Sequence, residues 1–112
     1  MPGTSIDLNI LKKLKQIMDD DFNELIEIFI SDGQSQLKTL KAAIDSSAAS
    51  DIRRIAHTLK GSSANLGLLT LSETCKTLEY NAAENIFDDA NELFEKIKSE
   101  FEEAKLTLEE IL

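Results

Sequence analysis

The chain is poor in the residues that build disulfides and zinc sites. Its 112 residues include one cysteine, Cys75, and one histidine, His57. A lone cysteine cannot form an internal disulfide, and these two side chains cannot make a tetrahedral zinc site of nitrogen and sulfur ligands. We therefore expect no metal site, and we expect Cys75 to be a small buried apolar side chain rather than a reactive thiol.

Proline, long apolar runs and targeting signals are equally scarce. The one proline is Pro2, so no later helix is interrupted by proline. No apolar run approaches the roughly 18 residues that a membrane-spanning helix needs. The N-terminus also lacks the basic-then-apolar pattern of a signal peptide. We expect a cytoplasmic protein that does not associate with membranes.

Basic residues are fewer than acidic residues. The chain has 12 Lys and Arg residues against 21 Asp and Glu residues, a formal net charge of −9. Nucleic-acid affinity comes largely from neutralising phosphates with basic side chains. This balance argues against a nucleic-acid partner.

Apolar residues recur every three or four positions along most of the chain, and no stretch alternates long enough to predict a strand. The predicted helices cover approximately residues 6–18, 22–44, 52–66, 71–82 and 90–111. Short breaks between them predict an all-α fold, an antiparallel four-helix bundle with a short additional N-terminal helix. Residues 1–112 are predicted to form a single domain, with residues 1–5 disordered or vector-derived.

Three local signals refine these helices. Asp7 is a predicted N-cap for the first of them. Gly33 lies inside the second helix, where glycine costs about 1 kcal/mol relative to alanine, and this predicts close helix packing at that point. The segment 46–50 is the predicted loop before the third helix, and its serines are predicted to cap that helix.

His57 is predicted to face solvent. At about 100° per residue, it points roughly 160° away from the centre of the apolar stripe of the third helix. A core role is thereby excluded. Arg53, Lys60, Gly61 and Ala64 share its face, so the histidine is surrounded by basic or very small side chains.

These residue types suit phosphoryl chemistry. A neutral imidazole nitrogen is nucleophilic near neutral pH, and Lys60 can balance the charge of a transferred phosphoryl group. Gly61 and Ala64 leave room for another protein to dock, with Arg53 at the edge of the same surface. A glycine inside a helix is destabilising, so chance explains Gly61 poorly.

The run Ala56–Gly67 reads AHTLKGSSANLG. It resembles the signature of histidine phosphotransfer (HPt) domains, which is His-x-Leu-Lys-Gly followed by small residues and a glycine. In that family a glutamate or glutamine about 22 positions after the histidine orients its ring, and this offset falls on Glu79. Glu79 is predicted to lie at the border of the apolar stripe of its helix, where its side chain faces a neighbouring helix. The position nine before the histidine, often aspartate in the family, is Ala48 here.

The resemblance implies a module of a multistep two-component phosphorelay. His57 would accept a phosphoryl group from a phospho-aspartate and pass it to another receiver aspartate. The partners would be receiver domains of response regulators or hybrid sensor kinases. They would supply the magnesium ion, so no cofactor is expected on this chain, which is expected to be a monomer. No glycine-rich ATP-binding motif is present, so no kinase activity of its own is expected.

Two other interpretations remain open at this stage. The chain could be the histidine-bearing first domain of a chemotaxis-type kinase, phosphorylated directly by an ATP-binding domain. It could also be a non-enzymatic helical adaptor in which His57 is idle. A hydrolase is disfavoured because no serine or cysteine nucleophile accompanies His57 in a recognisable arrangement.

Overall fold

A computed structural model describes residues 6–112, so the prediction about residues 1–5 lies outside the described part of the chain. The helices are α1 (Leu8–Met18), α2 (Asp20–Asp45), α3 (Ala49–Asn65), α4 (Leu69–Ala83) and α5 (Ala90–Ile111). The prediction of an all-helical chain is confirmed. None of the helices within residues 6–112 combines the length and the apolar content that a bilayer crossing requires.

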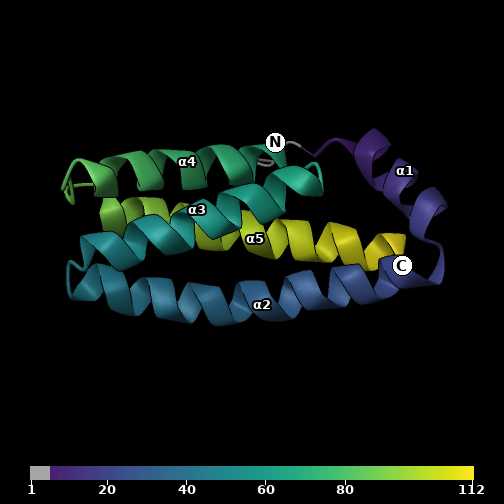
Figure 1. Ribbon diagram of the computed structural model, residues 1–112, viewed down its shortest axis with the longest axis horizontal. Coiled ribbons are helices and arrows are strands. Elements are labelled where there is room, and N and C mark those ends of the chain that lie inside the picture. The colour runs from purple at the N-terminus through teal and green to yellow at the C-terminus, as the bar shows by residue number, and fades with distance from the viewer. Residues whose placement is uncertain (1–5) are drawn as a thin grey trace.

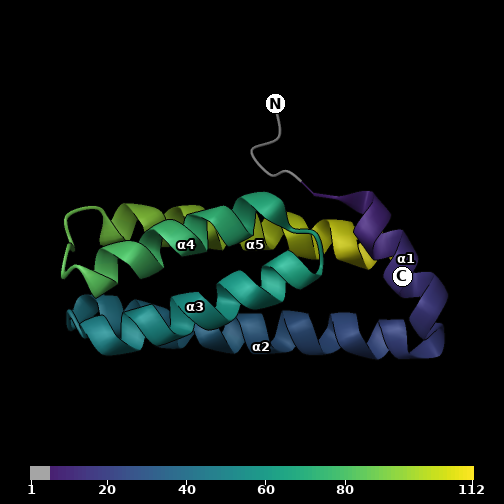
Figure 2. The same ribbon diagram turned by 45° about the horizontal axis from the view of Figure 1, so that its top comes forward.

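The four longer helices lie side by side, and successive helices run in opposite directions (Figure 1). In the turned view, α4 and α5 form the upper part of the molecule and α2 and α3 the lower part, with α3 and α4 nearer the viewer and α1 angled across one end (Figure 2). The pair α3 and α4 makes the most extensive helix–helix contact. This pairing matters because the two helices carry the residues of the candidate site.

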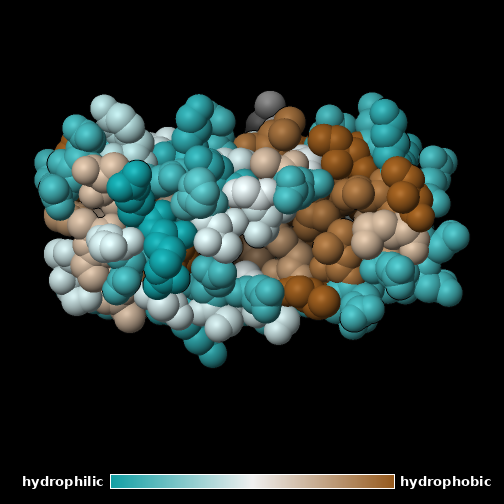
Figure 3. Space-filling model, viewed as in Figure 1, coloured by the Kyte–Doolittle hydropathy of each residue, from teal (hydrophilic) through white to brown (hydrophobic). Residues whose placement is uncertain are grey.

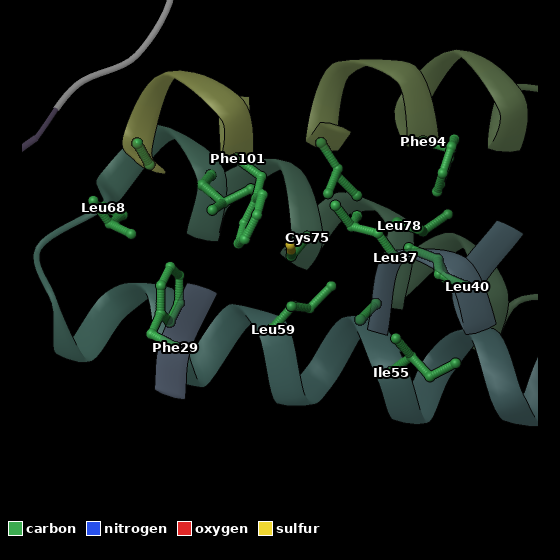
Figure 4. Packing of buried hydrophobic residues seen from close by; sticks show 14 of the residues in the cluster. Phe29, Leu37, Leu40, Ile55, Leu59, Leu68, Cys75, Leu78, Phe94 and Phe101 are labelled. Carbon is green, nitrogen blue, oxygen red and sulfur yellow. The ribbon is translucent and has the colours of Figure 1, made fainter. Parts of the chain in front are cut away.

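The core lies between α2, α3, α4 and α5 and is filled by aliphatic and phenylalanine side chains (Figure 4). Phe101 is buried at the position where α5 passes Gly33 of α2. A Cβ added to Gly33 would overlap the Phe101 ring, so the predicted close packing at this glycine is confirmed. The ring of Phe101 also packs against Phe29, with 5.7 Å between centroids. Gly33 therefore lets α2 and α5 approach each other.

Helix boundaries confirm one predicted cap and contradict another. The carboxylate of Asp7 accepts a hydrogen bond of 3.0 Å from the backbone N–H of Asn9, as an N-cap should. The predicted serine cap of α3 is wrong, since its N-cap is Ala48 and no side chain caps it. The Ser46 hydroxyl instead donates to the Ala42 carbonyl at 3.0 Å and so completes the end of α2.

Cys75 is fully buried, as predicted. Burial raises the pKa of its thiol to about 12, and the negative charges of Glu100 and Glu79 contribute to the rise. The thiolate is the nucleophilic form, so this cysteine is unreactive at neutral pH.

Glu100 is an acidic residue on the buried face of α5. It is 5% exposed, and its Oε1 atom has no hydrogen-bond partner among the described residues. Burial raises the pKa of this carboxyl, and the neighbouring Thr74 hydroxyl and Lys96 offset the rise only in part. The ionised form is therefore disfavoured in the folded chain.

Replacing Glu100 by Gln is expected to stabilise the fold at neutral pH. A carboxyl whose pKa is raised on folding favours the fold below its unfolded pKa, and this contribution is lost as pH rises through the folded pKa. The gain in melting temperature of Glu100→Gln over wild type should therefore widen from acid to neutral pH. Thermal melts across that range measure it, and a gain that is the same at every pH would contradict the assignment.

Candidate functional site

His57 lies on the solvent-facing side of α3, as predicted. Its side chain is 67% exposed, whereas Ile55 and Leu59 on the opposite side of the helix are buried in the core. The fold itself therefore needs nothing from the imidazole, and the ring is accessible to another macromolecule.

Glu79 of α4 holds the ring from the neighbouring helix. The distance from His57 Nδ1 to Glu79 Oε2 is 2.8 Å, so the predicted contact across 22 positions is present. An ionised carboxylate can only accept, and therefore Nδ1 carries the hydrogen and donates it. In the neutral ring, Nε2 then has the free lone pair.

Lys60 binds the other oxygen of the same carboxylate. Its Nζ atom lies 2.7 Å from Glu79 Oε1. The Lys60 ammonium, with a smaller contribution from His57, lowers the pKa of Glu79 below its ordinary value despite partial burial of the carboxyl. Glu79 is thereby kept ionised and bridges two side chains of α3. The prediction for Lys60 concerned the transferred group alone, and it missed this contact.

A side chain of α4 also binds the backbone of α3 near the site. The Ser72 hydroxyl donates a hydrogen bond of 3.0 Å to the main-chain carbonyl of Lys60. This bond fixes α4 against α3 close to the helix turn that carries His57. The spacing between His57 and Glu79 is thus supported by this bond between a side chain and the main chain as well as by the ion pair.

Beside the histidine the surface is bare. Gly61 is exposed, and a Cβ added there would meet no atom within 4 Å. Internal packing therefore does not require a glycine at this position, in contrast to Gly33. Ala64 and Arg53 are exposed on the same helix, so all three predicted surface residues are accessible to solvent.

A groove with an apolar floor adjoins this surface. It has a volume of about 600 Å³ and lies where α1, α2 and the second half of α3 meet. Its lining includes Leu14, Met18, Leu25, Ile28 and Leu66. Figure 3 shows the apolar surface gathering towards the end of the molecule that carries α1.

Sequence reasoning missed this groove because Leu14, Met18 and Leu25 fit the periodic apolar patterns that predict the first two helices. In the structure Leu14, Met18 and Leu25 are only partly buried and line the groove together with Ile28, which is 50% exposed. One signal was available: the segment 25–30 reads LIEIFI, which carries more apolar side chains than a single buried stripe of a helix can use.

Metal ligands do not gather at this site or elsewhere in residues 6–112, where no group of three or more His, Cys, Asp or Glu side chains could hold an ion. The site therefore offers three reactive groups: the exposed imidazole of His57 with its hydrogen on Nδ1, the carboxylate of Glu79 and the ammonium of Lys60.

Comparison with known proteins places the chain in a family. The family model described as the Hpt domain matches residues 24–110. A comparison with curated protein sequences found no match.

Among solved structures, histidine-containing phosphotransfer protein B (HptB) from Pseudomonas aeruginosa PAO1 is 29% identical with a TM-score of 0.92, and the alignment covers 97% of this chain and 95% of that protein. Yeast Ypd1p is 28% identical over 74% of this chain and 52% of that protein, with a TM-score of 0.67.

A co-crystal structure of Saccharomyces cerevisiae Ypd1, a histidine phosphotransfer signaling protein, with the receiver domain of its downstream response regulator Ssk1 is also similar. It is 21% identical with a TM-score of 0.69, over 98% of this chain and 92% of that one. At this identity the likeness supports the fold.

Proposed function

This chain belongs to the Hpt domain family, and on that premise we propose that it is a phosphotransfer intermediate in which His57 is the phosphorylated residue. One observation carries the proposal. The ring is largely exposed and is held through Nδ1 by Glu79, which leaves Nε2 as the nitrogen available for attack. The antiparallel bundle formed by α2 to α5 serves as the rigid support for this ring.

The transfer needs no proton movement on this chain. Nε2 of His57 attacks the phosphorus of a phospho-aspartate, the phosphorus–oxygen bond breaks, and the aspartate leaves as a carboxylate. The ring becomes positively charged, because Nδ1 keeps its hydrogen. Glu79 stabilises that charge, and the reverse sequence passes the group to a second aspartate.

Lys60 has two roles in this proposal. It anchors Glu79 through one N–H, and an ammonium has two further donors that can reach the phosphoryl oxygens. Positioning and electrostatic stabilisation are the main contributions to phosphoryl transfer. The partner domain would supply the magnesium ion, which would neutralise charge on those oxygens.

The partners we propose are receiver domains, the class of domain with which Ypd1 was co-crystallised. The surface that would meet them runs from His57 across Gly61 into the groove. Thr58 and Ser62 line the groove and directly follow His57 and Gly61 in the sequence. A single domain could therefore cover the groove and reach the imidazole.

The proposal is tested by mixing the chain with a purified receiver domain phosphorylated by acetyl phosphate. Appearance of acid-labile, base-stable label on this chain is the expected result. Incubation with ATP alone should give no label, since no kinase activity is proposed. Absence of label with every receiver of the host organism would contradict the proposed function.

Gly61→Gln is expected to slow transfer while stabilising the helix. The substitution removes a helix-destabilising glycine, worth several tenths of a kcal/mol, but places a long side chain on the docking surface. Melting temperature and transfer rate should therefore move in opposite directions. Ala42→Gln, on an exposed part of α2 away from the groove, is the control and should transfer normally. Unchanged transfer in Gly61→Gln would show that this surface is not covered by the partner.

A further inference from the structure

The groove beside His57 carries one charged side chain. Asp32 lines it from α2, and the other lining residues are apolar or uncharged, with Thr58, Ser62 and Asn65 facing it from α3. Asp32 is exposed, and no ion pair involving it is formed within residues 6–112. A single carboxylate thus lies within a surface that is otherwise suited to burial against a partner.

No cation of this chain lies where it could pair with Asp32 along its helix. Side chains three and four positions away are the neighbours on a helix surface. For Asp32 these neighbours are Ile28, Phe29, Ser35 and Gln36, and none is basic. The α3 side of the groove is uncharged as well.

Covering the groove therefore sets a condition on the partner. A carboxylate that loses its water without gaining a partner strongly destabilises the complex. A lysine or arginine of the partner that pairs with the carboxylate offsets most of this desolvation cost. A partner that places an apolar or acidic side chain opposite Asp32 therefore binds weakly. Such a penalty against the wrong partner is a common source of specificity.

We infer that Asp32 is a specificity-determining residue, which selects receiver domains that present a lysine or arginine within the apolar surface that docks in the groove. The inference rests on the proposed function, since it assumes that the groove is covered during transfer to and from His57. Asp32 acts on docking and does not touch the reacting atoms.

The test compares the rates at which phosphorylated receiver domains transfer to wild type, Asp32→Asn, Asp32→Lys and Glu27→Lys. Glu27 is exposed on α2 and does not line the groove, so Glu27→Lys makes the same charge change elsewhere on the same helix. With a receiver that serves wild type, Asp32→Lys should lower kcat/KM about tenfold or more, mainly through KM. Asp32→Asn should lower it by only about two- to fivefold. Glu27→Lys should stay near wild type, and the Asp32 effect should shrink at high salt.

Charge-exchange variants of the receiver complete the test. Each lysine or arginine on the surface around its phospho-aspartate is changed singly to glutamate, and one such variant should restore transfer to Asp32→Lys. Equal rates for Asp32→Lys and Glu27→Lys, or the lack of any restoring variant, would overturn the role of Asp32 and leave the proposed function standing. Failure of wild type to accept label from any receiver would overturn both.

Discussion

His57→Gln is expected to accept no phosphoryl group from any receiver domain. Glutamine has no nucleophilic nitrogen at neutral pH, and His57 is the only histidine of the chain. The fold should survive, because the side chain is largely exposed and makes no contribution to the core. Radiolabel transfer from a phosphorylated receiver measures acceptance, and circular dichroism with thermal melting measures the fold.

Two controls separate loss of chemistry from loss of structure. Arg53→Gln changes an exposed neighbour on the same helix, and it should still accept label at a measurable rate. The His57 variant should still bind the unphosphorylated receiver, because the groove is intact. Acid-labile label on His57→Gln at wild-type levels would show that the acceptor is another residue.

Glu79→Ala is expected to slow phosphorylation without preventing it. The charge-assisted hydrogen bond to His57 is lost, while the nucleophile and docking surface remain. A bond of this exposed kind contributes about 1–3 kcal/mol, which corresponds to a loss of rate of roughly five- to 150-fold. Single-turnover rates at saturating phospho-receiver measure this effect, which should fall on the chemical step and leave KM nearly unchanged.

Glu79→Gln is the matched variant. Its amide oxygen still accepts the hydrogen of Nδ1, so it should be slowed less than Glu79→Ala. Wild-type rates in Glu79→Ala would mean that the contact between His57 and Glu79 is incidental to transfer.

Acid stability provides a readout of Glu79 that is independent of transfer. Its pKa is lowered on folding, chiefly by the hydrogen bond from Lys60. A carboxyl of this kind stabilises the fold above its unfolded pKa, and the contribution is lost as pH falls through the folded pKa. Wild type should therefore lose melting temperature on acidification more steeply than Glu79→Gln in that range. Parallel curves would contradict the ion pair.

Periodicity predicted the helices well because each of the longer ones buries one face in a shared core. It could not predict the start of α3, where three serines of the segment 46–50 offered a cap and the Ser46 hydroxyl was used by the preceding helix instead. Competition between the two helix ends for one hydroxyl is decided by the path of the loop, and the residue pattern does not contain that path.

The candidate site was likewise predictable only in part from the sequence. The exposure of His57 follows from its angle to the apolar stripe, and the family offset identified Glu79. The contact between Lys60 and Glu79 depends on how closely α3 and α4 approach, which the sequence of neither helix specifies alone. The groove was not predicted because Leu25 and Ile28 are as apolar as core residues, and the residue pattern does not show that α1, α2 and α3 leave a groove where they meet.

The central claim is that His57 carries the phosphoryl group between receiver domains, and locating that group on the chain tests it most directly. Wild type would be incubated with a phosphorylated receiver, digested at alkaline pH, and sequenced by tandem mass spectrometry. The account predicts one added phosphoryl group on the peptide that contains His57, and its loss when a second, unphosphorylated receiver is added. A phosphoryl group on any other residue, or one that the second receiver cannot remove, would contradict it.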